Sequence, residues 1–173
     1  MRASLIASAA VLFAAIAAPA AARIAPQTAP QTVQAFPLVG TWTLAEADEI
    51  KADGTRIQNY GADARGRLII DADGRYSLQI FRPDRARFAS GNKFAGTADE
   101  YRDAVHGMST HYGRLEIEPG GRTLAFHIEQ AAFPNWEGKV QRRGYVLTDG
   151  RLSYEVPPAA DGTVARSVWQ RTE

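Results

Sequence analysis

From Leu38 onward, apolar and polar residues alternate in short runs that are separated by glycine-containing turns. A period of two places successive side chains on opposite faces of a β-strand. Asp-Gly pairs stand between several of the runs, and this dipeptide favours hairpins because both of its turn positions tolerate a positive φ. The pattern predicts nine strands, at about residues 40–51, 55–60, 67–72, 75–81, 111–118, 122–130, 139–148, 151–156 and 163–171.

Several of these runs also show which face of the sheet is buried. Their apolar members recur at every second position, opposite polar residues such as Arg75, Gln79 and Glu129. Such a division suits an antiparallel sheet with one face in water, and many short antiparallel strands indicate an all-β sandwich or barrel. The residues predicted to face the core are Tyr76, Leu78, Ile80, Leu124, Phe126, Ile128, Leu152, Tyr154 and Val156.

One segment breaks the alternation. Thr97 and Glu100 have the spacing of a capping box, in which the two side chains bond the free amides at the start of a helix. Apolar residues then follow at helical spacing, which predicts a short helix over about residues 98–107. A long polar and aromatic loop, 82–94, precedes it, and such an insertion in a β-meander usually caps something.

The first residues have the pattern of a secretory signal peptide. Arg2 supplies a positive start, an apolar run spans 5–18, and Ala20 and Ala22 fit the small-residue cleavage pattern. The run is shorter than the roughly 20 residues that span a membrane, so no stable membrane anchor is expected. We therefore predict a signal peptide over 1–22 with cleavage after Ala22, a flexible linker over 23–37, a single domain over 38–173, and a periplasmic or extracellular location.

Composition excludes several kinds of chemistry. The 173 residues include no cysteine, which rules out disulfides, thiolate metal sites and cysteine nucleophiles. A net charge of +1 gives no electrostatic footprint for nucleic acid. The histidines fall in three different elements without a metal-binding spacing, and no Gly-x-Ser-x-Gly elbow is present. We expect no metal, no cofactor and no nucleic-acid partner.

A series of motifs resembles the bacterial and fungal lipocalin-like domain family over about residues 38–171. The resemblance implies a lipocalin-like antiparallel β-barrel of about eight to ten strands with one short helix, and an interior that takes a small ligand. This chain departs from the family pattern at His111 and Phe126. The motifs are Gly40-Thr41-Trp42, Arg82-Pro83-Asp84-Arg85, Phe88-Ala89-Ser90, Tyr112-Gly113, Phe133-Pro134-Asn135-Trp136 with Gly138, the Arg143 strand, and Val168-Trp169-Gln170-Arg171.

A barrel leaves no free edge, so its first and last strands are expected to pair. This places Arg171, at the end of the last strand, close to Trp42 in the first.

The candidate binding residues combine arginine forks with aromatic rings. Arginine can hold a carboxylate or an enolate, and aromatic rings can flank an apolar body. Arg143 shares a strand face with Tyr145 and Leu147, so we expect it to project into the barrel, where it needs a protein carboxylate or a ligand anion. In the alternative, these groups satisfy one another and close the barrel end. The five candidates are Arg82, Tyr101, Tyr112, Trp136 and Arg143.

We interpret the chain first as a binder of a small hydrophobic or aromatic molecule, acidic ligands included. Two alternatives stay open. One is a cofactor-free cyclase or isomerase that uses the cavity to preorganise a reactive compound. The other is an accessory protein whose barrel is filled by its own side chains. An open cavity favours the first two interpretations over the third.

Overall fold

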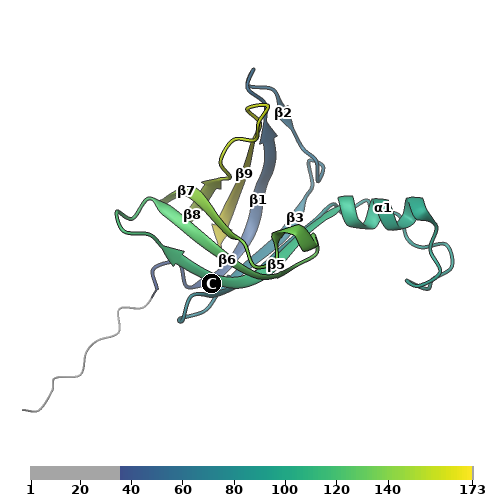
Figure 1. The fold of residues 1–173 in the computed structure, drawn as a ribbon, viewed down its shortest axis with the longest axis horizontal. Helices are drawn as coiled ribbons and strands as arrows, with labels where there is room; N and C mark the ends of the chain where they lie inside the picture. Colours follow the sequence, from purple (N-terminus) through teal and green to yellow (C-terminus); the bar gives the residue numbers. More distant parts are fainter. Residues whose placement is uncertain (1–35, 173) are drawn as a thin grey trace, which may run out of the picture. The chain divides into compact units, whose positions relative to one another are not determined.

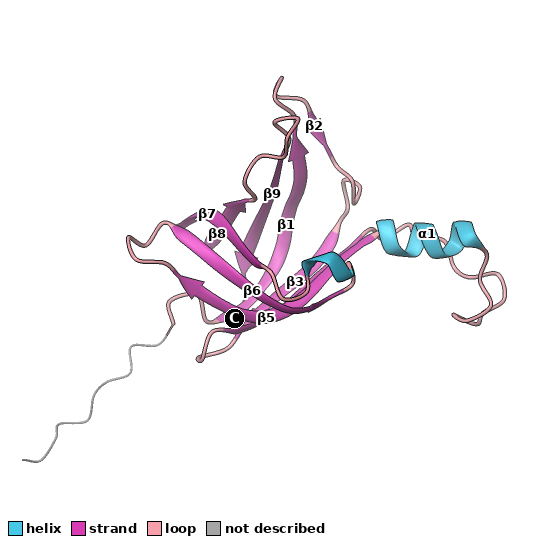
Figure 2. Ribbon diagram, in the orientation of Figure 1, coloured by secondary structure: helices cyan, strands magenta, loops and turns pink. Residues whose placement is uncertain are grey.

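The computed structural model describes residues 36–172. The predicted signal peptide and all but the last two residues of the predicted linker lie outside this range. The described chain is mainly strand, with one α-helix and a single 3-10 turn (Figures 1 and 2). The elements are β1 (Gly40–Ile50), β2 (Arg56–Ile57), β3 (Arg65–Ile70), β4 (Arg75–Phe81), α1 (Ala98–His106), β5 (Met108–Ile117), β6 (Thr123–Ala131), η1 (Pro134–Trp136), β7 (Val140–Thr148), β8 (Arg151–Glu155) and β9 (Val164–Arg171).

The strands form a closed antiparallel barrel. Strands β3 to β9 follow one another in sequence order, and β1 pairs with both β3 and β9 to complete the ring. The two-residue strand β2 adds to the end of β1 only. Trp42 pairs with Arg171, and the Arg171 guanidinium lies 4.2 Å from the centre of the Trp42 ring system. The predicted barrel and the predicted closure are both confirmed.

Most of the predicted elements agree with the structure to within a few residues. The exception is the strand predicted at 55–60, which is limited to Arg56–Ile57. A turn follows directly, because the N–H of Gly61 donates to the carbonyl of Gln58 at 2.8 Å and Gly61 adopts a φ of +76°. The predicted helix is confirmed as α1, and both hydrogen bonds of its capping box are present.

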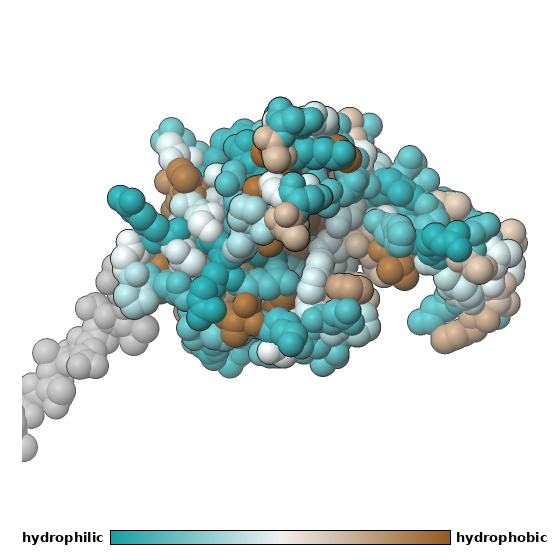
Figure 3. Space-filling view, turned by 45° about the horizontal axis from the view of Figure 1, so that its top comes forward, coloured by the Kyte–Doolittle hydropathy of each residue, from teal (hydrophilic) through white to brown (hydrophobic). Residues whose placement is uncertain are grey.

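Helix α1 is not the cap of a buried core. None of its residues is buried, and it extends from the ends of β4 and β5 (Figure 2). The insertion is held by its own contacts, among them an ion pair between Arg82 and Asp103 of α1. The face shown in Figure 3 is mostly hydrophilic, with hydrophobic residues in scattered spots. Within residues 36–172, no helix combines the length and the apolar composition needed to cross a membrane.

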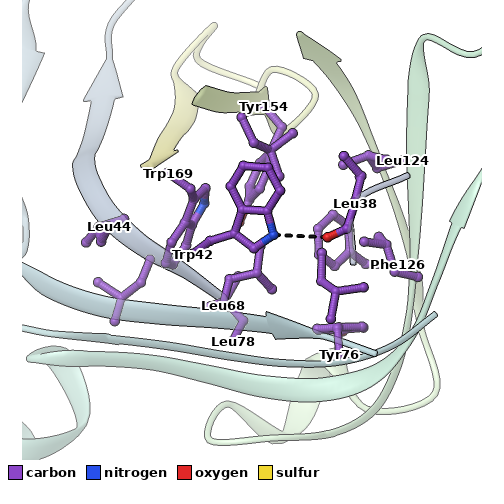
Figure 4. Packing of buried hydrophobic residues seen from close by; sticks show 14 of the residues in the cluster. Leu38, Trp42, Leu44, Leu68, Tyr76, Leu78, Leu124, Phe126, Tyr154 and Trp169 are labelled. Carbon is purple, nitrogen blue, oxygen red and sulfur yellow. Dashed lines mark hydrogen bonds between the residues drawn. The ribbon is translucent and has the colours of Figure 1, made fainter. Parts of the chain in front are cut away.

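Large buried side chains fill the barrel around the start of β1. Trp42, Leu68, Leu152 and Trp169 are each fully buried there. Leu38, just before β1, is also fully buried, and its carbonyl accepts a hydrogen bond from Nε1 of Trp42 at 3.0 Å (Figure 4). This end of the barrel is therefore filled by side chains of the protein itself.

Candidate functional site

A cavity of about 240 Å³ lies inside the barrel. Strand β1 runs from Trp42 in the packed core to Ala47 and Glu49 in the cavity wall, so the filled region and the cavity follow one another along the barrel. The apolar and aromatic residues that line the cavity include Leu78, Ile80, Trp136, Tyr154 and Val156. The polar residues that line it include Glu49, Asn59, Tyr60, Ser109, His111, Gln141 and Arg143.

The side chain of Arg143 points into the barrel because successive side chains of β7 lie on opposite faces of the sheet. It pairs across the sheet with Leu124, whose side chain is fully buried, so both residues face inward. Arg143 is only 5% exposed. Its guanidinium carbon lies 4.1 Å from the ring centre of Phe126 and 5.0 Å from that of Tyr154. The cation thus lies against two neighbouring aromatic rings at the cavity wall.

The guanidinium of Arg143 is incompletely paired. Nη2 donates to Oε1 of Gln141 at 2.6 Å, whereas Nε has no hydrogen-bond partner. No Asp or Glu of the described chain lies within ion-pair distance of it. A guanidinium stays charged in proteins, and a buried charge needs a counter-charge. The cavity therefore presents a cation without a protein anion bonded to it.

His111 lies beside this cation and is itself buried. Its Nδ1 shares a 2.8 Å hydrogen bond with the hydroxyl of Tyr76. Burial and, after it, the charge of Arg143 lower the pKa of His111 from its ordinary value of 6.5 to about 3. Burial also raises the pKa of Tyr76. At neutral pH both groups are uncharged, so they offer hydrogen bonds and leave the positive charge to Arg143.

The low pKa of His111 predicts an acid-sensitive contribution to stability. Below pH 6.5 the unfolded chain protonates this histidine while the folded chain does not, so its contribution falls as the pH drops toward 3. The slope it adds is at most about 1.4 kcal/mol per pH unit. We expect His111→Gln to reduce the pH dependence of the free energy of unfolding between pH 6 and 4, measured by urea denaturation.

Tyr76→Phe is the matched control for this measurement. It removes the hydrogen bond but keeps the histidine buried, and burial is the main cause of the low pKa. The wild-type slope should therefore persist in Tyr76→Phe. Equal slopes in wild type and His111→Gln would contradict the burial effect.

Of the five residues predicted for the site, the structure brings two together. Arg143 and Trp136 both line the cavity. Trp136 lies in η1, and its ring meets those of His111 and Phe133 edge to face at 6.0 and 5.5 Å. These contacts place the indole over the cavity from the β6–β7 connection.

Arg82, Tyr101 and Tyr112 lie away from the cavity. Arg82 forms ion pairs with Asp84, at 2.9 Å, and with Asp103. The Tyr101 hydroxyl accepts a hydrogen bond from the N–H of Gly96 at 3.0 Å within the same insertion. Tyr112 is 48% exposed on the outer face of β5. The first two stabilise the insertion, and strand alternation turns the third outward.

Sequence reasoning missed several residues of the cavity wall, and for one of them the signal was present. Leu115 is buried, and counting back from it in steps of two reaches His111 and passes over Tyr112. The same alternation that identified other buried faces therefore assigns His111 to the interior. Tyr60, from the loop after β2, had no comparable signal because loops have no fixed period.

The histidines provide no metal site in the described part of the chain. His106 ends α1, His111 is inside the barrel, and His127 bonds Glu116 at 3.2 Å on the outer face. Across residues 36–172, no three His, Cys, Asp or Glu side chains are grouped closely enough to hold a metal ion.

One family model and several solved structures match this chain. A mutant of the fluorescent protein UnaG is 19% identical, with 78% of this chain and 96% of that chain covered and a TM-score of 0.36. A fatty acid transporter, REP1-NXSQ, is 14% identical, with 79% and 96% covered and a TM-score of 0.36. No curated protein matches significantly. The model of a family described as a lipocalin-like domain matches residues 39–172, nearly all of the described chain, and the protein therefore belongs to the lipocalin-like domain family.

Proposed function

We propose that this domain binds a small, largely apolar molecule inside its barrel and holds an anionic group of that molecule on Arg143. The observation that carries the proposal is the buried, incompletely paired guanidinium in the wall of an internal cavity. A carboxylate or phenolate would supply the missing counter-charge and accept charge-assisted hydrogen bonds, which are the stronger kind.

The rest of the cavity suits an apolar or aromatic body. Trp136 and Tyr154 offer broad ring faces, and Leu78, Ile80 and Val156 add aliphatic surface. Removing apolar surface from water contributes about 25 cal/mol per Å². The affinity would then come from burial of the body, and the orientation from the anion on Arg143.

The cavity also separates this proposal from the alternative of a filled barrel. A filled barrel needs protein side chains throughout its interior, whereas here a space of about 240 Å³ adjoins the guanidinium. A cyclase or isomerase would use the same space, so a turnover assay with a bound compound separates catalysis from carriage.

We further propose that the protein works outside the cytoplasm. The support is the sequence of its first 22 residues, with a positive start, a short apolar run and small residues at 20 and 22. Sequencing of the exported protein from its N-terminus should find Arg23 first. A soluble exported form that retains Met1 would contradict the proposed cleavage.

The binding proposal is tested by isothermal titration calorimetry with matched probes. Octanoate and 2-naphthoate are each compared with a neutral analogue, 1-octanol and 2-naphthol. We expect saturable one-to-one binding of at least one carboxylate, more tightly than its neutral analogue. Failure of both carboxylates to bind, or equal affinity for carboxylate and neutral analogue, would overturn the proposal.

A further inference from the structure

A β-bulge turns one carboxylate of β1 toward the cavity. The register between β1 and β9 shifts between Leu44 and Glu46. Beyond the shift, Glu49 pairs with Ala165, and both line the cavity. The residue before it, Asp48, also lines the cavity and is almost fully buried, but one of its carboxylate oxygens pairs with Arg56. The bulge therefore brings Glu49 to the inner wall, where its carboxylate is not paired with Arg56 as that of Asp48 is.

Glu49 lies near the end of β1 that is farther from the packed core. It is the penultimate residue of β1 and pairs with Ile57 of the short strand β2. Trp42 in the packed core is seven positions earlier, which corresponds to roughly 23 Å along a strand. Arg143, in contrast, lies mid-strand in β7 against two aromatic rings. The cavity thus has an interior cation and a carboxylate nearer its rim.

The carboxylate of Glu49 forms no ion pair with the residues from 36 to 172. Tyr60 is close enough to interact with the charge of Glu49, and the polar residues Asn59 and Ser109 line the same cavity. Burial raises the pKa of Tyr60, and the negative charge of Glu49 raises it further. Tyr60 therefore keeps its proton, and Glu49 offers this region a carboxylate without an ion-pair partner among residues 36–172.

We propose that Glu49 selects the far end of the ligand: it binds a hydrogen-bond donor such as an ammonium or hydroxyl group and repels a second carboxylate. This rests on the proposed function, because the first carboxylate must be held by Arg143. Opposite charges a few ångströms apart attract and like charges repel by similar amounts, so one residue supplies both attraction and exclusion. The ligand class is then a small apolar acid with a donor at its other end.

The experiment compares three probes of one chain length: octanoate, 8-aminooctanoate and octanedioate. Calorimetric titration of the wild-type protein should give tighter binding of 8-aminooctanoate than of octanedioate. In Glu49→Gln, the affinity for octanedioate should rise about tenfold and that for 8-aminooctanoate should fall about tenfold. Octanoate, which has no second polar group, should bind both proteins alike.

Glu116→Gln is the matched control. Glu116 is on the outer face, where it bonds His127, and this variant should keep the wild-type order of the probes. The inference is overturned if Glu49→Gln leaves that order unchanged, or if it weakens all three probes equally. Failure of the proposed function would give a different result. In that case Arg143→Met and the wild-type protein would bind octanoate with equal affinity.

Discussion

Replacing Arg143 with methionine is expected to weaken the binding of octanoate or 2-naphthoate by about 2–5 kcal/mol. Methionine keeps a long apolar side chain against Phe126 and Tyr154 but removes the charge that would bind the carboxylate. Binding of the neutral analogues 1-octanol and 2-naphthol should change little. Isothermal titration of wild type and variant with each pair measures the difference.

Arg142→Met provides the matched control. Arg142 is the preceding residue, its side chain is 61% exposed on the outer face, and it pairs with Glu118 at 2.6 Å. Its loss should leave both affinities unchanged. Because Arg143 has no bonded carboxylate to be left unpaired, Arg143→Met should not lower the melting temperature. A lower melting temperature with unchanged affinity would assign Arg143 a structural role.

Replacing Trp42 with alanine is expected to lower the free energy of unfolding by about 3–5 kcal/mol. The ring is fully buried, its Nε1 bonds the carbonyl of Leu38, and Arg171 stacks on it at the closure of the barrel. Truncation opens a void and also removes contacts that join the first strand to the last. Urea denaturation, with the change read from the midpoint at constant slope, is the measurement.

Trp136→Ala separates the effect of this core position from the general loss of a tryptophan. Trp136 is only partly buried, at the cavity, so its removal should lower the free energy of unfolding by about 1 kcal/mol. If Trp42→Ala were no more destabilising than Trp136→Ala, Trp42 would not be the centre of the packed end.

Alternation of residues is sufficient to predict most of this fold. Inward sets such as Leu124 and Phe126 are buried as expected, because a barrel that is wet outside and dry inside imposes a period of two on every strand. The length of β2 could not be predicted, since the turn that ends it depends on the conformation of Gly61. The exposed position of α1, away from the buried core, could not be predicted either, because a capping box specifies where a helix begins but not what the helix packs against.

The site was predictable only where alternation continues unbroken. Arg143 follows directly from its neighbours in β7, and His111 could have been reached by counting back from Leu115. Glu49 could not, because counting forward from Trp42 in steps of two passes over it, and only the bulge after Leu44 shifts the inward positions by one residue. Arg82 belongs to a family motif, but its carboxylate partners in the insertion hold it away from the barrel.

The central claim, that the barrel holds an apolar anion on Arg143, is tested most directly by a crystal structure of the protein with 2-naphthoate. The account predicts the naphthalene ring inside the cavity against Trp136 and Tyr154, with a carboxylate oxygen about 2.7–2.9 Å from the Arg143 guanidinium. A structure in which 2-naphthoate binds outside the barrel, or in which a protein carboxylate closes onto Arg143 and fills the cavity, would contradict it.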